Sequence, residues 1–211
     1  MAQIRRTQAE RSAATRAALL NATVDTLIDS GYRGTTTQAV AKRAGASYGA
    51  LLHHFPTKAD LLGAAVRHLF DQRLAEFRKT MVDLPSDVPK VDAAIDVLWA
   101  MFQGPTFTAW LELWVGARTD PDLADAVAAV DREFVDTSIE IFRELFADET
   151  AQDPDLPRLA IGMAYTFLDG LALSRLYAGY RPHDLDELLE VFKQLVSTAM
   201  PTNPDRSEAQ R

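Results

Sequence analysis

Residues 35–58 read TTTQAVAKRAGASYGALLHHFPTK, and this stretch predicts two short helices joined by a tight turn. Thr36 and Ser47 each precede a helix-forming run, and a hydroxyl at such a position accepts a hydrogen bond from a free amide of the first turn. Gly45 lies between the two helices, where the chain needs a positive φ that glycine adopts without steric penalty. Pro56 ends the second helix, because proline disfavours helical backbone in the residue before it.

The spacing within this stretch predicts a helix-turn-helix. Ala41 precedes Gly45 by four residues, and Leu51 follows it by six. A side chain larger than alanine at position 41 would hold the two helices apart, whereas Leu51 is expected to close the small core between them. In a helix-turn-helix the second helix enters the major groove of DNA. The stretch therefore predicts a DNA-binding segment.

The same stretch resembles the DNA-binding segment of the TetR (tetracycline-repressor) family of bacterial regulators. The resemblance is carried by Thr35-Thr36, Val40-Ala41, Ala44-Gly45-Ala46-Ser47, Gly49, His53-His54-Phe55, Lys58 and Asp60-Leu61. One position departs from the pattern: Leu52 stands where many members carry a tyrosine that hydrogen-bonds a phosphate, and we assign Leu52 to packing. The motif covers roughly the first third of the chain, and beyond it the resemblance is a pattern of helices.

Charge is distributed unevenly along the chain, whose net charge is −8. Residues 1–60 contain eight Lys/Arg and four acids, a balance of +4, and the remaining residues carry −12. Salt largely screens charges that are more than about 8–10 Å apart. The local positive charge therefore governs contact with phosphates. The acidic remainder repels DNA and favours one docking orientation.

Candidate DNA-binding residues follow from the predicted helix-turn-helix. We expect the major groove to be contacted by the early residues of the second helix, Ser47, Tyr48, Gly49, Ala50 and His53. We expect phosphates to be contacted by Thr36, Gln38, Lys42, His54 and Lys58. The alternative for Tyr48 and His53 is that they cover the small core.

The rest of the chain predicts an all-α protein. Thr7 and Glu10 resemble a capping box that opens a first helix, which ends at Asp29-Ser30-Gly31. A long helix follows Pro56, and further helices are expected at Val91–Phe102, Phe107–Arg118, Pro121 to about Phe146, Leu156–Tyr180 and Leu185–Met200. We assign residues 12–72 to a DNA-binding domain with the helix-turn-helix at about 35–54, residues 73–200 to a ligand-binding and dimerisation domain, and residues 201–211 to a disordered tail.

Two of these helices predict a homodimer. The segments 121–146 and 156–180 carry apolar residues on more than one face, so each must be buried on more than one side. A second copy of the chain would cover them in a four-helix interface with two-fold symmetry.

Aromatic residues concentrate in the C-terminal part, where the bland interpretation is a packed core. Resemblance to the TetR family implies a pocket for a small apolar or amphipathic effector there. The candidates for lining it are Trp99, Phe102, Phe107, Trp110, Trp114, Tyr165, Asp169 and Tyr177.

Other functional classes find little support in the sequence. The chain has no cysteine, and of its four histidines only His53 and His54 are neighbours, which point to different faces of a helix and make a poor ligand pair. We therefore expect no metal site and no cofactor. We find no nucleophile elbow, no phosphate-binding loop and no stretch of about 18 consecutive apolar residues, and we therefore expect neither an enzyme nor a membrane protein. The N-terminus lacks the apolar core of a signal peptide, which indicates a cytoplasmic protein.

These observations predict a transcriptional regulator, a homodimeric repressor that a ligand releases from a near-palindromic operator. Two helix-turn-helix units on one face of the dimer would lie about one turn of duplex apart, ~34–36 Å, or a multiple of it. The rival hypothesis is an all-α small-molecule-binding protein or enzyme that retains the helix-turn-helix unit.

Overall fold

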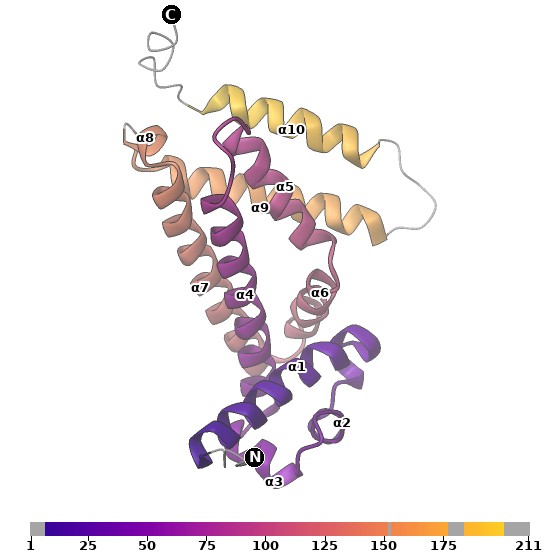
Figure 1. Ribbon diagram of the computed structural model, residues 1–211. Coiled ribbons are helices and arrows are strands. Elements are labelled where there is room, and N and C mark those ends of the chain that lie inside the picture. The colour runs from indigo at the N-terminus through magenta and orange to yellow at the C-terminus, as the bar shows by residue number, and fades with distance from the viewer. Residues whose placement is uncertain (1–6, 152, 177–183, 201–211) are drawn as a thin grey trace, which may run out of the picture. The chain divides into compact units, whose positions relative to one another are not determined.

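The computed structural model describes residues 7–151, 153–176 and 184–200, and within them every regular element is a helix (Figure 1). In chain order these are α1 (Gln8–Gly34), α2 (Thr37–Arg43), α3 (Tyr48–His54), α4 (Lys58–Val82), α5 (Lys90–Gln103), α6 (Pro105–Ala117), α7 (Pro121–Leu145), α8 (Ala147–Thr150), α9 (Leu156–Leu176) and α10 (Leu185–Ala199). The predicted all-α class is confirmed. The expected disordered tail and the end of the helix expected at 156–180 lie outside the described residues.

The chain forms two compact units, and α4 and α7 contribute residues to both. The first unit combines Met1–Gln72 with Pro105–Phe134, and the second combines Arg73–Gly104 with Val135–Arg211. Residues 105–134 thus pack with the N-terminal helices, because Leu113 of α6 and Leu123 of α7 share a buried core with Leu27 of α1. The assignment of separate functions to residues 12–72 and 73–200 stays a prediction.

The predicted helix caps of the helix-turn-helix are confirmed. The Thr36 hydroxyl accepts a hydrogen bond from the Ala39 amide at 3.1 Å, and the Ser47 hydroxyl accepts one from the Ala50 amide at 3.1 Å. At the start of α1, the Thr7 hydroxyl accepts from the Glu10 amide in the predicted capping box. Each cap satisfies an amide that the helix itself leaves unpaired.

The turn between α2 and α3 depends on the left-handed conformation of Gly45, whose φ is +64°. This conformation lets the Ala46 amide donate to the Ala41 carbonyl at 3.0 Å and the Gly45 amide donate to the Lys42 carbonyl at 3.2 Å. The pair of bonds is a Schellman motif, which closes the last turn of α2. The prediction of a positive φ at Gly45 is confirmed.

A small core joins α2 and α3 to α1. Ala41 is 4% exposed, and Val40 and Leu51 are fully buried. They share one cluster with Leu19 and Leu20 of α1. The predicted roles of Ala41 and Leu51 in the core between the two helices are confirmed.

Tyr32, at the end of α1, contacts both α6 and the turn before α7. The regular part of α1 ends at Gly31, whose φ is +65°. Beyond it the Tyr32 amide donates to Glu112 Oε2 at 2.8 Å, and the Tyr32 hydroxyl donates to Asp120 Oδ2. The ring packs so closely on α6 that a Cβ at Gly116 would lie 2.7 Å from it. Any larger residue at position 116 would therefore displace Tyr32.

The contact between Tyr32 and Asp120 shifts the pKa of both groups. Burial, with the hydrogen bond and negative charge of Asp120, raises the pKa of Tyr32 to about 12. The hydrogen bond from Tyr32, with a second from the Leu123 amide, lowers the pKa of Asp120. Both shifts indicate a neutral phenol bound to an ionised carboxylate at neutral pH.

In the second unit α5 packs against α9 and α10. The Lys193 ammonium of α10 lies 2.6 Å from Asp96 of α5 and 2.7 Å from Glu190. Burial acts against the charged ammonium, but these two carboxylates outweigh it and raise the pKa of Lys193. The triad thereby joins α10 to α5.

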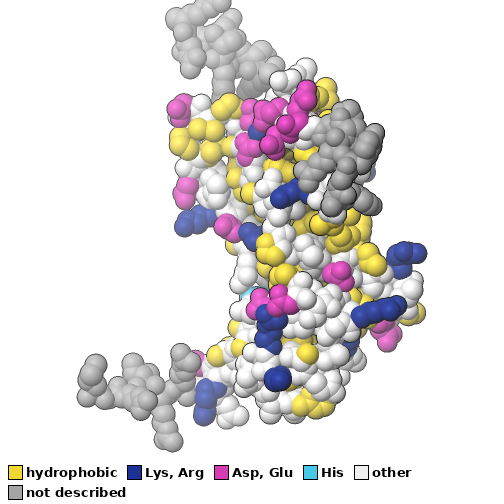
Figure 2. All heavy atoms as spheres, turned by 90° about the vertical axis from the view of Figure 1, so that its right-hand side faces the viewer, with side chains coloured by type: hydrophobic (Ala, Val, Ile, Leu, Met, Phe, Trp, Pro, Cys, Tyr) yellow, Lys and Arg dark blue, Asp and Glu magenta, His cyan; other side chains and the backbone are white. Residues whose placement is uncertain are grey.

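Apolar side chains remain exposed on the last two helices, and Figure 2 shows hydrophobic side chains in yellow on one face of the molecule. They are Leu159, Met163 and Leu176 of α9 and Val191 and Leu195 of α10, with exposed fractions between 46% and 64%. By length and mean hydropathy α9 would pass for a membrane span, although helices that pack in a protein core have the same composition.

We expect Ala41→Leu to lower the free energy of unfolding by about 1–3 kcal/mol, because the added atoms overpack a site with no room for them. Thermal and urea unfolding measure the loss. Ala128→Leu, on an exposed position of α7, is the matched control and should change stability little. Equal stability of the two variants would show that α2 and α3 do not meet at position 41.

We expect Tyr32→Phe to lower the stability of the protein in a pH-dependent way. Because the pKa of Tyr32 rises from 10.0 to about 12 on folding, the contribution of its hydroxyl is complete below pH 10 and is lost as the pH rises towards 12. Urea unfolding of both proteins at pH 8, 10 and 11.5 measures the difference, which should be constant at first and then shrink. A difference that persists unchanged at pH 11.5 would contradict the hydrogen bond.

Candidate DNA-binding surface and ligand cavity

Helix α3 buries one residue and exposes the opposite face. Leu51 is fully buried, whereas Tyr48 is 45% exposed and Leu52 is 39% exposed. Tyr48 and Leu52 are four residues apart and therefore lie on the same face of the helix. This exposed face is the part of α3 that could enter a groove of DNA.

The predicted DNA-binding residues all lie in or beside α2, α3 and the first turn of α4. The exposed ones are Thr36, Gln38, Lys42, Ser47, Tyr48, Gly49 and His53, and the half-buried ones are Ala50, His54 and Lys58. The alternative that Tyr48 covers the small core does not fit its exposure. The individual contacts with DNA stay predictions.

Gly49 is a glycine that the surrounding fold does not require. No atom lies within 4 Å of the position that a Cβ at Gly49 would occupy, and the φ of Gly49 is not positive. A glycine without an intramolecular reason is consistent with close approach of the backbone to another molecule.

Cations near α3 differ in how far they are already neutralised. The Arg43 guanidinium lies 2.6 Å from Asp29 and 3.8 Å from Asp25. Lys42, its neighbour on α2, is exposed and forms no ion pair with any residue the structure describes. Lys42 is therefore better placed than Arg43 to bind a phosphate.

The Lys58 ammonium makes contacts within the protein. It donates to the Tyr32 carbonyl at 3.1 Å and lies 4.1 Å from the centroid of the Tyr32 ring. Burial lowers the pKa of Lys58, and the charge of Asp120 acts in the opposite direction. The bond to the Tyr32 carbonyl uses one of the three N–H donors of the ammonium, and the contact of Lys58 with a phosphate stays a prediction.

The assignment of Leu52 to packing is wrong, because this side chain is 39% exposed. A leucine at this place offers an apolar contact, such as one with a thymine methyl group, where a tyrosine would offer a hydrogen bond. Helical spacing from Tyr48 could have placed Leu52 on the exposed face of α3.

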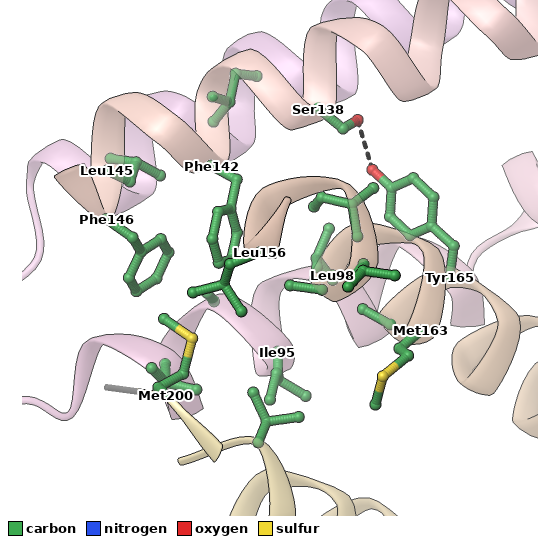
Figure 3. A pocket seen from close by; sticks show the side chains of 18 of the residues that line it. Ile95, Leu98, Ser138, Phe142, Leu145, Phe146, Leu156, Met163, Tyr165 and Met200 are labelled. Atoms are coloured by element: carbon green, nitrogen blue, oxygen red, sulfur yellow. Dashed lines mark hydrogen bonds between the residues drawn. The ribbon is translucent and has the colours of Figure 1, made fainter. Parts of the chain in front are cut away.

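The second unit contains a cavity of about 520 Å³ (Figure 3). Parts of α4, α5, α7, α9 and α10 line it. The labelled residues in Figure 3 are Ile95, Leu98, Ser138, Phe142, Leu145, Phe146, Leu156, Met163, Tyr165 and Met200. Its volume lies within the range of about 300–1,000 Å³ that small-molecule pockets occupy.

The chemistry of this cavity is almost wholly apolar. None of its lining residues carries a charge, and hydroxyl groups come from Ser138 of α7 and Tyr165 of α9. The Tyr165 hydroxyl donates to Ser138 Oγ at 2.6 Å, and Figure 3 shows this bond at one side of the cavity. Such a lining can bind hydrocarbon and offer one polar contact.

The eight residues predicted to form a ligand pocket do not come together around this cavity, and Tyr165 alone of the eight lines it. Trp99 is 5% exposed and buried in the second unit, and Phe102 packs on the Tyr165 ring at 5.9 Å. Phe107, Trp110 and Trp114 belong to the first unit, where Trp110 packs edge-on against Phe70 and Trp114 is 47% exposed. Asp169 is half-buried on α9, and Tyr177 lies outside the described residues.

Most of the residues that line the cavity could not be predicted from the sequence, because they are aliphatic. Ile95, Leu98, Leu156 and Met200 have the helical spacing of ordinary core residues. Periodicity predicts which face of a helix is buried, but it does not reveal where packed faces leave a space between them.

Two family models match the chain. One describes bacterial regulatory proteins of the tetR family and matches residues 19–65, and the other describes the C-terminal part of BetI-type transcriptional repressors and matches residues 90–201. The first match spans the helix-turn-helix, and the second spans every element that lines the cavity except α4.

Individual proteins give the same picture. The HTH-type transcriptional regulator Rv2912c of Mycobacterium tuberculosis is 34% identical over 170 residues, which cover 81% of this chain and 87% of the relative. A TetR-family regulator of Rhodococcus sp. has the same fold, with a TM-score of 0.71 at 20% identity over 90% of this chain and 100% of the other. A regulator of Saccharomonospora viridis in complex with choline aligns with a TM-score of 0.65 at 17% identity, over 90% and 100% of the two chains. From its helix-turn-helix and these matches, the chain belongs to the TetR family of bacterial transcriptional regulators.

Proposed function

We propose that this DNA-binding regulator is a homodimeric repressor, which a small molecule bound in the cavity of the second unit releases from its operator. It works by binding alone, without catalysis, at DNA in the cytoplasm. The proposal rests on the observation that one helix, α4, begins beside α3 and also contributes Leu74 and Phe77 to the lining of the cavity.

Exposure and charge support DNA binding through α3. Its outer face carries Tyr48 and His53, while Leu51 on its inner face holds it to the small core. Lys42 and Gln38 of α2 are exposed beside it and can bind phosphates. The arrangement matches a recognition helix, with base contacts from α3 and positioning contacts from α2.

Exposed apolar residues on α9 and α10 support a dimer. Leu159 and Met163 lie one turn apart on α9, and Val191 and Leu195 lie one turn apart on α10; all but Val191 also line the cavity. Gly162, beside Met163, has no atom within 4 Å of its virtual Cβ, which leaves room for another helix to approach. Two copies of this pair of helices would bury the exposed surface in a four-helix interface.

This interface differs in one helix from the sequence expectation, which paired segments 121–146 and 156–180. The large hydrophobic residues that are exposed on the described chain include none in α7, because its apolar stripes are turned into the two units. We therefore propose that α10 takes the place assigned to the 121–146 segment.

Release follows if the ligand favours one arrangement of α4 over another. The half of α4 that includes Leu61 packs in the core with α3, and the other half lines the cavity. A ligand changes the equilibrium between two arrangements only by the difference in its affinity for them. We propose that the ligand-bound arrangement spaces the two α3 helices unsuitably for one operator.

The BetI-type match and the choline complex of the S. viridis protein raise a quaternary ammonium as the ligand. That structure is 17% identical to this chain, which speaks for the fold alone. The lining of this cavity holds no carboxylate to balance such a cation. We therefore do not extend choline to this chain.

Operator binding can be tested without knowledge of the regulated genes. The purified protein selects duplexes from a random-sequence pool, and a gel shift tests both the selected duplex and the DNA upstream of the coding region. We expect a near-palindromic consensus with two equivalent half-sites. Binding that shows no sequence preference would overturn the proposed regulator role for α3.

We expect Lys42→Ala to weaken binding similarly on all duplexes and to lower the salt slope of log K by about one, because one phosphate contact is lost. Tyr48→Ala is the contrasting variant: it should change the selected consensus, with less effect on the slope. Fluorescence anisotropy between 50 and 300 mM salt measures both. An unchanged slope for Lys42→Ala would contradict its phosphate contact.

We expect Val191→Lys to convert the dimer to a monomer, because a charge would be buried in an apolar interface. Ala128→Lys introduces the same charge at an exposed position of α7 and should leave the dimer intact. Light scattering after size exclusion measures the mass of each. A monomeric wild-type protein, or a dimeric Val191→Lys protein, would argue against the α9–α10 interface.

A further inference from the structure

We propose that the cavity of the second unit binds an uncharged, largely hydrocarbon molecule with one hydrogen-bond donor, which the hydroxyl pair of Ser138 and Tyr165 recognises. The inference rests on the proposed ligand-released function. It adds the chemical class of the ligand and the two residues that select it.

The absence of charge from the described lining excludes ionic ligands. Burial of an ion without a partner is strongly unfavourable, so a ligand carboxylate or ammonium would need a counter-ion in the cavity. The lining residues provide none. Cations next to lining residues in the sequence are bound within the protein. Lys193, beside Phe192, is held by Asp96 at 2.6 Å and Glu190 at 2.7 Å, and Lys90, beside Val91, donates to the Leu145 carbonyl and lies 5.2 Å from the centroid of the Phe146 ring.

The aromatic rings of the lining favour hydrocarbon over a quaternary ammonium. Recognition of such a cation requires several ring faces that converge on it. Here Phe142 is stacked on Phe146, with centroids 4.7 Å apart, and Phe192 is stacked on Phe167, with centroids 4.2 Å apart. One face of each of these rings is therefore covered by its neighbour and is not available to a cation. What they present to the cavity is apolar surface of the kind that packs on alkyl chains.

The hydroxyl pair gives the cavity its polar contact. Ser138 is 4% exposed, and the Tyr165 hydroxyl donates its proton to Ser138 Oγ at 2.6 Å (Figure 3). A phenol that donates its proton becomes a better acceptor at the same oxygen. A ligand O–H or N–H group directed at Tyr165 would extend this bond into a chain of three groups. The rest of the ligand would lie among Leu98, Leu156 and Met200.

The ligand class is tested with four probes of one chain length. 1-Decanol has the donor, nonyl methyl ether has the same number of heavy atoms without it, and decanoate and decyltrimethylammonium carry opposite charges. Calorimetry or displacement of a neutral fluorescent naphthylamine gives each Kd. We expect 1-decanol to bind at least about 100-fold more tightly than either ion. From 1-hexanol upwards each added methylene should tighten binding about fourfold until the cavity is full.

Substitutions in the cavity test whether the ligand hydroxyl binds Tyr165. Tyr165→Phe should weaken 1-decanol about threefold to tenfold and leave the ether nearly unchanged, because it removes the hydroxyl that would accept from the ligand and changes the cavity volume by one oxygen atom. Ala164→Phe, which fills the cavity, should abolish binding of both. Ala128→Phe, at an exposed position of α7, is the size-matched control and should bind like the wild type. Melting temperatures verify that each variant is folded.

The outcomes separate this inference from the proposed function. Tighter binding of decanoate or decyltrimethylammonium, or an unchanged Kd of folded Tyr165→Phe for 1-decanol, overturns the ligand class. Selective binding of 1-decanol that leaves the complex with operator DNA intact supports the ligand class and overturns the release step. Release of DNA by an ionic probe alone supports ligand control and overturns the neutral ligand.

Discussion

The left-handed turn at Gly45 is the constraint on which the DNA-binding part of this protein depends. With φ at +64°, the Ala46 amide reaches back to the Ala41 carbonyl and closes α2, and the chain leaves in the direction that lets Ser47 cap α3 at once. Two short helices of seven residues each would be unstable alone. They persist because the turn sets Leu51 of α3 into the same core as Ala41. The exposed face of α3, with Tyr48 and Leu52, is the consequence of that burial.

The two units differ in how their charged and polar groups are paired. Near α3 the protein keeps cations such as Lys42 at the surface, where they can bind DNA phosphates and displace the counter-ions condensed on them. In the second unit the polar groups bind one another: Lys193 is satisfied by Asp96 and Glu190, and Tyr165 by Ser138. A cavity lined in this way discriminates through the cost of desolvating charge more than through attraction. The neutral ligand that we propose follows from the same principle, because an uncharged molecule loses little by leaving water.

Tyr32 illustrates a role that the sequence could not have assigned. It follows Gly31, and from sequence alone it belongs to the end of the first helix. In the fold its amide, hydroxyl, carbonyl and ring contact Glu112, Asp120 and Lys58, residues that are 26 to 88 positions away in the chain. Lys58 likewise has contacts that its place in the sequence does not reveal. Its position at the start of α4 predicts a phosphate contact, and the fold adds a bond from its ammonium to the Tyr32 carbonyl and a contact with the Tyr32 ring.

The sequence by itself determined the helices, their caps and the helix-turn-helix, because those signals act over three to five residues: Thr36, Gly45 and Ser47 each bond to a backbone group within that distance. It also predicted the buried positions of Ala41 and Leu51, since helical periodicity is local. Only the tertiary structure decided that α6 packs with the N-terminal helices and that Leu52 is exposed. It also decided that aliphatic residues, four phenylalanines and Tyr165, and not the tryptophans, surround a cavity. The physical reason is that a cavity is a mismatch between packed surfaces. It arises from the distances among five helices, so the sequence of any one helix does not reveal it.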